Sequence, residues 1–213
     1  MNNIETKRFI TNNKMLYFNG SLVEVRARRP RPAAERAGDT AANSHKGASD
    51  EIIMRFLIVD APVPSTLGPY IKELGRHRVR HLVRVCSQTY RSDVVEMAHI
   101  KTHAWPFEDG APPPQHVVDQ WLSLIDSEVA NAGADGQCST IAVHCVAGLG
   151  RAPILVAVAL VEYGDFAPMD AVGYIRERRR GAINQVQLNW LMAYRPRHSA
   201  RKGFSLGQCC VVS

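Results

Sequence analysis

Apolar and polar positions alternate along this chain with two different periods. Short apolar runs rich in β-branched residues predict strands, and apolar residues spaced three and four apart predict helices. The predicted strands are 22–28, 52–59, 79–85, 100–104 and 140–144. The predicted helices are 67–74, 93–98, one opened by the prolines 112–114, one following the turn after 144, 168–179 and 185–194. This order predicts an α/β fold with a central, mostly parallel sheet flanked by helices, whose ligands bind at the carboxyl ends of the strands.

The first 50 residues form an N-terminal extension with a different pattern. Residues 22–28 alternate apolar and charged side chains, which predicts a half-buried edge strand. Residues 29–50 contain no aromatic or large aliphatic side chain, so burial cannot offset the entropy of ordering them, and we expect a disordered loop. Residues 1–20 are expected to be poorly ordered. The domain itself is assigned to 51–195, and a basic tail to 196–213.

Length and composition bound the class of protein. A chain of 213 residues with 46% hydrophobic and 22% charged side chains is typical of one soluble globular domain, and excludes a disordered or collagen-like protein. The longest apolar run, 152–161, is about half of the ~20 residues that a membrane-spanning helix needs. Residues 1–20 lack the apolar core of a secretory signal, so we expect the chain to stay in the cytosol.

The formal net charge of +6 is unevenly distributed. Residues 1–50 carry nine basic against five acidic side chains, 51–170 carry nine against fourteen, and 171–213 carry eight against one. An acidic body with a basic end favours an anionic surface over nucleic acid as the partner. The five cysteines form no CxxC pair, which argues against a zinc site and a fully paired disulfide framework. No metal and no cofactor are predicted.

The residues that carry chemistry lie between strand 140–144 and the next helix. The stretch reads His144-Cys145-Val146-Ala147-Gly148-Leu149-Gly150-Arg151-Ala152-Pro153. Two glycines allow a turn whose backbone N–H groups all point inward as an anion cradle, so 146–151 are the predicted substrate-binding residues. Arg151 supplies a planar two-pronged donor for two phosphoryl oxygens. Cys145, ringed by N–H dipoles at a helix N-terminus, is predicted to be a thiolate that attacks phosphorus; the alternative is a buried structural cysteine.

A phosphoryl transfer of this kind also needs a proton donor near the leaving oxygen. The segment 105–110, Trp-Pro-Phe-Glu-Asp-Gly, has an aromatic anchor at one end and a glycine at the other. Asp109 is the predicted general acid and Glu108 the second choice, although adjacent acids on a loop are also common as solvated surface residues. His144, Glu108, Ala152 and Gln187 are assigned supporting positions.

At these motifs the chain resembles a known family. HCVAGLGRAP, with WPFEDGAPPP upstream and RRGAINQVQL downstream, resembles the phosphatases of regenerating liver, or type 4A tyrosine phosphatases, within the cysteine-dependent dual-specificity phosphatases. The resemblance runs from about residue 52 to the end, and the insert 29–50 departs from the family's tight hairpin. It implies the compact dual-specificity fold, with Cys145 as nucleophile, Arg151 as phosphate clamp and Asp109 as general acid.

The resemblance also matches Cys86, in VRVCSQTY, to a cysteine that forms a reversible disulfide with the nucleophile in this family. Without the resemblance, the sequence indicates only that Cys86 is a buried side chain at the end of a strand. Most relatives place Ser or Thr directly after the arginine, where a hydroxyl helps to expel the cysteine, but this chain has Ala152. We therefore expect slow hydrolysis of the phosphocysteine.

Three functions remain open at this point. The first is a membrane-anchored phosphatase of phosphotyrosine, or of phosphoserine and phosphothreonine, in proteins. The second, implied by the resemblance, is a pseudo-phosphatase binding module that regulates a magnesium transport mediator through its cystathionine-β-synthase-like domains. The third is a phosphoinositide phosphatase, although the cradle lacks lysines between Cys145 and Arg151. Homo-oligomerisation stays open.

The C-terminus predicts attachment to a membrane. Cys210-Val211-Val212-Ser213 is a prenylation box whose terminal serine favours farnesyl. Upstream lie Arg195, Arg197, His198, Arg201 and Lys202. A single lipid chain binds a protein to a membrane only weakly, and each basic side chain near an anionic leaflet adds ~1 kcal/mol to the binding free energy. We expect the cytoplasmic face of the plasma or endosomal membrane, with a cytoplasmic or nuclear pool if unprenylated. Acylation of Cys209 stays open. The basic cluster 176–180 is either a solvated helix end or a contact surface.

Overall fold

The computed structural model describes residues 4–11, 14–28, 50–135 and 139–197, with side chains described in 18–26, 52–131 and 139–197. The strands are β1 (Ile4–Thr11), β2 (Lys14–Arg28), β3 (Asp50–Val59), β4 (Val79–Arg84), β5 (Lys101–Ala104) and β6 (Thr140–His144). The helices are α1 (Leu67–Arg76), α2 (Ser92–Glu96), α3 (Gln115–Asp135), α4 (Arg151–Tyr163), α5 (Pro168–Arg178) and α6 (Gln185–Ala193), with a short 3-10 turn, η2 (Pro64–Thr66). The predicted α/β class is confirmed, and those elements after residue 50 whose bounds were predicted lie within two residues of them.

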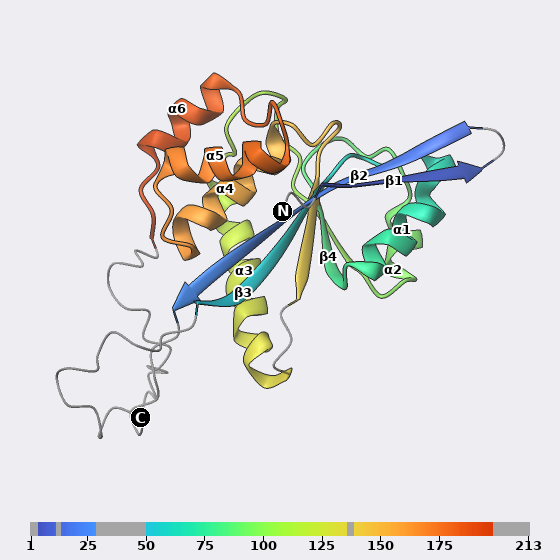
Figure 1. Ribbon diagram of the computed structural model, residues 1–213, viewed down its shortest axis with the longest axis horizontal. Helices are drawn as coiled ribbons and strands as arrows, with labels where there is room; N and C mark the ends of the chain where they lie inside the picture. Colours follow the sequence, from blue (N-terminus) through green and yellow to red (C-terminus); the bar gives the residue numbers. More distant parts are fainter. Residues whose placement is uncertain (1–3, 12–13, 29–49, 136–138, 198–213) are drawn as a thin grey trace.

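One six-stranded sheet, in the order β1-β2-β3-β6-β4-β5, runs through the molecule (Figure 1). The pairs β3–β6, β6–β4 and β4–β5 are parallel, and β2 is antiparallel to both β1 and β3. Val59 and Arg84 both lie opposite His144, so β3, β4 and β6 end side by side. The loops that follow these three strands therefore meet at one edge of the sheet.

Side chains that alternate along the strands belong to two apolar clusters, one on each face of the sheet. On β3, Phe56 and Ile58 enter a large cluster with residues of α3, α4, α5 and α6, whereas Leu57 and Val59 enter a smaller one with residues of α1. Trp121 of α3 packs its ring 5.2 Å from that of Phe56. The period of two along β3 thus sorts its side chains between the two helical layers.

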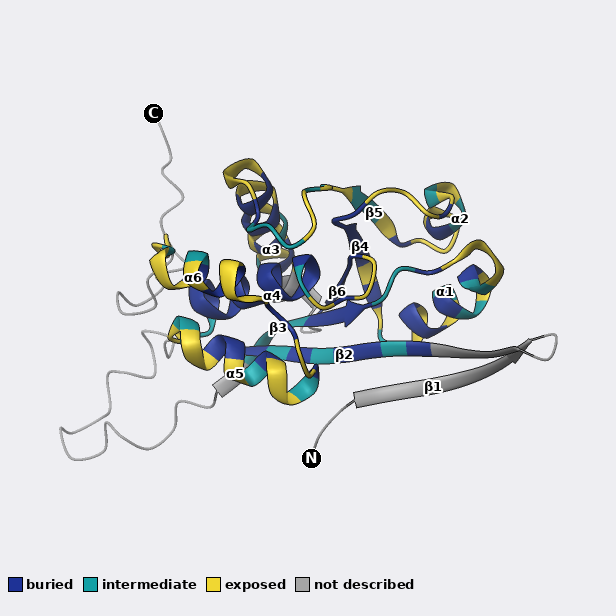
Figure 2. Cartoon of the chain, turned by 90° about the horizontal axis from the view of Figure 1, so that it is seen from above, coloured by how far each residue is buried: buried dark blue, intermediate teal, exposed yellow. Residues whose placement is uncertain are grey.

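The apolar run of 152–161 is the inner part of α4. Every residue of α4 is buried, and the helix contacts α3, α5 and α6 around it (Figure 2). Trp121 donates its indole N–H to the Leu155 carbonyl at 2.8 Å, which fixes α3 against α4. Within the described residues, no helix combines the length and the apolar character that crossing a bilayer requires.

The N-terminal extension differs from its prediction. Residues 4–11 form β1 and residues 14–28 form β2, where poor order was expected for 1–20 and a strand only for 22–28. Because β1 pairs along β2 from Ile4–Ser21 to Thr11–Lys14, β2 is not the edge strand. The pair Asn12-Asn13 between these strands is a sequence signal typical of a two-residue hairpin, and it was missed. Most of the predicted loop 29–50 lies outside the described residues.

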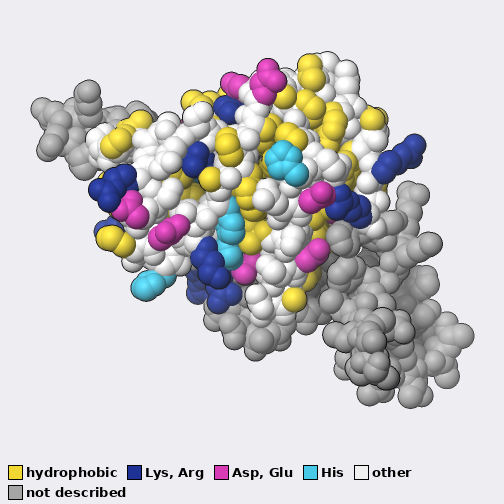
Figure 3. Space-filling view, turned by 180° about the vertical axis from the view of Figure 1, so that it is seen from behind, with side chains coloured by type: hydrophobic (Ala, Val, Ile, Leu, Met, Phe, Trp, Pro, Cys, Tyr) yellow, Lys and Arg dark blue, Asp and Glu magenta, His cyan; other side chains and the backbone are white. Residues whose placement is uncertain are grey.

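Surface charge is mixed on one face of the described residues. On the face in Figure 3, basic and acidic side chains are interspersed among apolar and neutral ones. Charges of both signs therefore lie together among the described residues of that face.

Candidate active site

The loop between β6 and α4 occupies the meeting point of the three strand ends. It contains 145–150, and α4 begins at Arg151. Gly148 has φ +62°, and a Cβ there would lie 2.5 Å from Arg179 Nη2 and 2.9 Å from the Val59 carbonyl oxygen. Only glycine fits both the backbone angle and the space, so this position lets the loop close on itself.

The carbonyl groups of this loop are all turned away from its centre. Each carbonyl oxygen from Cys145 to Gly150 accepts a hydrogen bond, at 2.6–3.2 Å. The donors, in order, are the His144 ring, the Ala61 N–H, the Arg179 guanidinium for two successive carbonyls, the Ile183 N–H and the Ile154 N–H. With the carbonyls held outward, the N–H groups are left facing the interior of the loop, which is the arrangement that binds an anion.

Arg151 joins this loop to the segment that carries the acids. Its guanidinium is buried, and Nη1 donates to the carbonyls of Phe107 at 3.2 Å and Val85 at 3.4 Å. Nε lies 3.1 Å from Asp109 Oδ1 as an ion pair, yet it has no hydrogen-bond acceptor among the described residues. Arg151 therefore links the start of α4 to the carbonyl of Phe107 and to the carboxylate of Asp109.

The predicted acid segment is held at both ends. The Trp105 N–H donates to the Arg84 carbonyl at 2.9 Å where β5 ends. At the other end, Asn184 Nδ2 donates to the Gly110 carbonyl at 2.9 Å. Between them Asp109 keeps 81% of its side chain exposed while it pairs with Arg151. The structure brings Asp109 to the clamp arginine, and the neighbouring Glu108 is exposed.

Gln187 is buried where three parts of the site meet. Its Nε2 donates to the Ala111 carbonyl at 3.0 Å, and a Cβ added to Gly150 would lie 3.3 Å from the same nitrogen. It also forms a capping box with Asn184 at the start of α6. Gln187 was assigned a supporting position from the sequence, whereas Asn184 was not singled out, although Asn three residues before Gln is a capping signal.

His144 supports the loop from below as a neutral ring. Burial lowers the pKa of His144 to about 4. Because the Cys145 carbonyl can only accept, Nδ1 donates to it at 3.2 Å, and Nε2 then accepts from the Tyr90 hydroxyl at 2.7 Å. Burial also raises the pKa of Tyr90, which keeps this hydroxyl a donor. Tyr90 was not identified from the sequence.

Cys86 and Ala152 are both buried and belong to the same apolar cluster as Cys145. Cys86 and Cys145 are free thiols, follow neighbouring strand ends and share the large apolar cluster. Burial is the main cause that raises the pKa of Cys86, against a smaller opposing effect of Arg151. Ala152, in the first turn of α4, is fully buried and brings no hydroxyl to the site.

Arg179 is the functional residue that sequence reasoning placed least well. From the sequence, the basic cluster 176–180 could be either a solvated helix end or a contact surface. In the structure, Arg179 is buried and donates to the Ala147 and Gly148 carbonyls. The same guanidinium pairs with Asp60 after β3. Nothing in the local sequence separates Arg179 from its neighbours, because only the tertiary fold places it beneath the loop.

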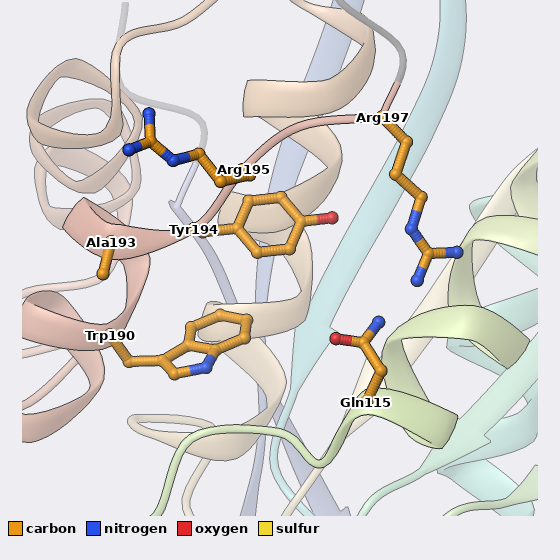
Figure 4. A pocket seen from close by; sticks show the side chains of 6 residues that line it. All are labelled: Gln115, Trp190, Ala193, Tyr194, Arg195 and Arg197. Carbon is orange, nitrogen blue, oxygen red and sulfur yellow. The ribbon is translucent and has the colours of Figure 1, made fainter.

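A separate pocket lies at the far end of α6. It has a volume of about 290 Å³ and is lined by Gln115, Trp190, Ala193, Tyr194, Arg195 and Arg197 (Figure 4). No residue of the 145–151 loop lines it. The predicted prenyl site Cys210, Cys209 and the basic residues from His198 onward lie outside the described residues.

Removal of the Arg179 side chain tests its role under the loop. Arg179→Ala leaves two loop carbonyls without their donor and removes the ion pair with Asp60, which keeps its hydrogen bond from Asn19. We expect a loss of about 1–3 kcal/mol in unfolding free energy for each carbonyl left unsatisfied, and a strong fall in activity. Urea unfolding and initial rates measure the two effects. Arg178→Ala is the matched control, because Arg178 stacks on Tyr174 with its guanidinium carbon 3.6 Å from the ring centroid and does not contact the loop. Equal behaviour of the two variants would contradict this role.

Comparisons with known proteins agree with this geometry. A family profile described as "Swiss Army Knife protein, DSP-PTPase phosphatase domain" matches residues 55–202. Protein tyrosine phosphatase PRL-1 of Trypanosoma cruzi is 56% identical over 162 residues, which cover 76% of this chain and 90% of that protein. Human protein tyrosine phosphatase type IVA 3 is 49% identical over 162 residues, covering 75% and 91%.

Solved structures show the same relationship. A protein tyrosine phosphatase from Leishmania major, 55% identical, superposes with a TM-score of 0.64 over 68% of this chain and 90% of that one. Kinase-associated phosphatase, at 21% identity and a TM-score of 0.52 over 66% and 89%, shares the fold. The chain therefore belongs to the PRL, or type IVA, family of protein tyrosine phosphatases, within the dual-specificity phosphatases.

Proposed function

We propose that this phosphatase removes phosphate from phosphoproteins at the cytoplasmic face of a membrane, through a phosphocysteine on Cys145 that hydrolyses slowly. The observation that carries the catalytic part is the loop whose carbonyls all point outward around Cys145. An inward-facing set of N–H groups beside a sulfur nucleophile binds a phosphoryl group and stabilises the charge that develops on its oxygens.

In the first step, the Cys145 sulfur attacks phosphorus and the bond from phosphorus to the leaving oxygen breaks. Asp109 gives its proton to that oxygen, and the alcohol or phenol departs. The loop N–H groups and the Arg151 guanidinium hold the three remaining phosphoryl oxygens. The ion pair between Arg151 and Asp109 places the acid beside the clamp that orients the substrate.

In the second step, water attacks phosphorus, the sulfur leaves, and Asp109 accepts a proton from the water. A hydroxyl next to the arginine would stabilise the departing sulfur by a hydrogen bond. Ala152 supplies no such hydrogen bond, because its fully buried side chain is a methyl group. Hydrolysis of the phosphocysteine is therefore expected to limit turnover.

A pre-steady-state experiment measures this limit. With an aryl phosphate, the enzyme should release about one equivalent of phenol in a burst and retain one phosphate, visible by intact-protein mass. Ala152→Ser should raise the steady-state rate on the order of tenfold, because the added hydroxyl assists the second step. Asp109→Asn should slow the burst by about a hundredfold.

Matched variants define the outcome of the burst experiment. Cys145→Ser should abolish both the burst and the retained phosphate. Ala157→Ser adds a hydroxyl to a different fully buried alanine of α4, and should not raise the steady-state rate. Sustained turnover of the wild-type enzyme without retained phosphate would contradict slow hydrolysis.

Regulation by oxidation is the second part of the proposal. Burial raises the pKa of Cys86, so Cys86 stays a thiol near neutral pH and Cys145 is the group that peroxide meets first. Peroxide converts the Cys145 thiolate to a sulfenic acid. Cys86 then attacks that sulfur, water leaves, and an S–S bond forms. The adjacent strand ends that carry the two cysteines support this pairing.

Mild peroxide provides the test of this pairing. Wild type should form a reducible disulfide between Cys86 and Cys145 and recover activity with a thiol reductant. Cys86→Ser should instead accumulate irreversible sulfinic acid on Cys145, measured by peptide mass spectrometry. The same degree of irreversible oxidation in both proteins would refute the protective disulfide.

Membrane attachment is proposed from the prenylation box and the basic tail. Cys210→Ser should release most of the protein into the soluble fraction of cells, since the basic segment alone holds weakly. Cys209→Ser keeps the box intact and serves as the control, with prenylation read by mass. Unchanged membrane recovery of Cys210→Ser would rule out this anchor.

The Ala152 position also favours the alternative function. A long-lived phosphocysteine blocks the loop for further substrate and suits a regulatory module bound to a magnesium transport mediator. A phosphoinositide substrate is less well supported, because the exposed side chains of the loop are Val146, Ala147 and Leu149, and none of them would bind further phosphate groups. Retention of phosphate by the wild-type protein separates the first alternative, a regulatory module, from an efficient enzyme.

A further inference from the structure

A chain of polar side chains lies outside the active site, on the face of the sheet that α3 covers. His81 of β4 contacts His103 of β5, with 2.9 Å between Nδ1 and Nε2. On its other side, His81 Nε2 lies 3.1 Å from Oε1 of Glu128 in α3. Ser139 Oγ donates to Oε2 of the same carboxylate at 2.7 Å. His81 and Glu128 are buried and His103 is half-buried, in a position with no part in the chemistry described above.

The hydrogen bonds in this chain have one consistent direction when both rings are neutral. The Glu128 carboxylate accepts, so His81 Nε2 carries the proton and His81 Nδ1 is an acceptor. His103 must then donate from Nε2. One extra proton can be accommodated, because a charged His81 donates from both nitrogens while His103 accepts. Two extra protons cannot, since both rings would then present N–H groups and positive charges to each other.

This hydrogen-bonded series of side chains ends at His103, next to the segment that carries the general acid. The ring centroids of His103 and Trp105 are 5.2 Å apart, and both side chains lie on the α3 face of the sheet. Trp105 is the first residue of the acid segment and is tied to β4 by its N–H. Phe107 and Asp109, which contact Arg151, follow within four residues. The orientation of the His103 ring thus bears on the start of the acid segment.

We propose that His103 is a positioning residue for the general-acid segment, held against Trp105 by the chain through His81 to Glu128, and that this support is lost when both imidazoles are protonated. The proposal rests on the role of Asp109 in the proposed function. His103 contacts neither the substrate nor Asp109, and acts through Trp105 only.

The charges around the pair set the direction of the pH dependence. Burial is the main cause that lowers the pKa of His81 and of His103 below 6.5, with Lys101 lowering both and Glu128 opposing the shift at His81. Arg80 lies 3.9 Å from Glu128. Burial raises the pKa of Glu128, but hydrogen bonds from Ser139 and His81 outweigh it and leave the pKa below its usual value. The supporting contact is therefore intact at neutral pH and is lost on acidification below the usual histidine range.

The leaving group of the substrate distinguishes positioning of the acid from general damage. Phenyl phosphate needs protonation of its leaving oxygen, whereas dinitrophenyl phosphate does not. We expect His103→Leu to slow the burst with phenyl phosphate about tenfold at neutral pH and the burst with dinitrophenyl phosphate less than about twofold. His116→Leu, on the exposed start of α3, is the control and should change neither rate.

A rescue variant tests whether His103 acts through its hydrogen bond to His81 or through packing alone. In His103→Gln, the amide nitrogen can donate to His81 Nδ1 as Nε2 does, but it cannot be protonated. This variant should keep the neutral-pH burst with phenyl phosphate within about threefold of wild type, and its rate should fall less steeply than that of wild type below pH 6.5. Nitrogen-15 NMR of the two imidazoles in the full chain follows their protonation directly.

The outcomes separate this proposal from the function on which it rests. If Asp109→Asn shows no difference between the two substrates, the acid assignment fails and the role of His103 fails with it. If Asp109→Asn shows the difference but His103→Leu slows both substrates equally or neither, only the positioning role is overturned. Failure of His103→Gln to restore the phenyl phosphate burst would also overturn it.

Discussion

The outward orientation of the carbonyls between β6 and α4 is the constraint on which the active site depends. A peptide loop cannot present its N–H groups to an anion unless its carbonyl oxygens find donors elsewhere, because buried carbonyls without partners are costly. Here those donors come from the loop after β3, from Arg179 and from Ile183. The reactivity of Cys145 therefore rests on groups that are distant in sequence.

Hydrogen bonds and an ion pair also join the loop to the acid segment. Arg151 reaches from the first turn of α4 to Phe107 and Asp109, and the start of α6 holds the other end of the segment through Asn184 and Gln187. Cys145, Arg151 and Asp109 are thus held by one connected set of hydrogen bonds and ion pairs. Arg179 after α5 and the start of α6 support the site from outside the loop, and the imidazole pair near α3 extends this framework to the start of the acid segment.

The strands and helices of the body were predictable because each has a strong local signal. Strand 52–59 and helix 67–74 have apolar patterns that admit one secondary structure, and Pro112–114 mark a helix start. Only the second half of β2, 22–28, has a clear alternation, so β1 and the first half of β2, where polar and apolar residues mix without a clear period, were missed. What stabilises β2 is its pairing with β3, a contact between segments that are 20 or more residues apart along the chain.

The sequence by itself determined the chemistry: a cysteine and an arginine at fixed spacing, glycines between them, and a pair of acids ahead of a proline-rich helix start. These residues act through local backbone geometry, so their order along the chain carries the information. Only the tertiary structure decided which acid meets Arg151, that Arg179 is buried beneath the loop, that Tyr90 and His144 share a hydrogen bond, and that two histidines of separate strands touch. Such pairings depend on strand register and helix placement, which no local pattern encodes.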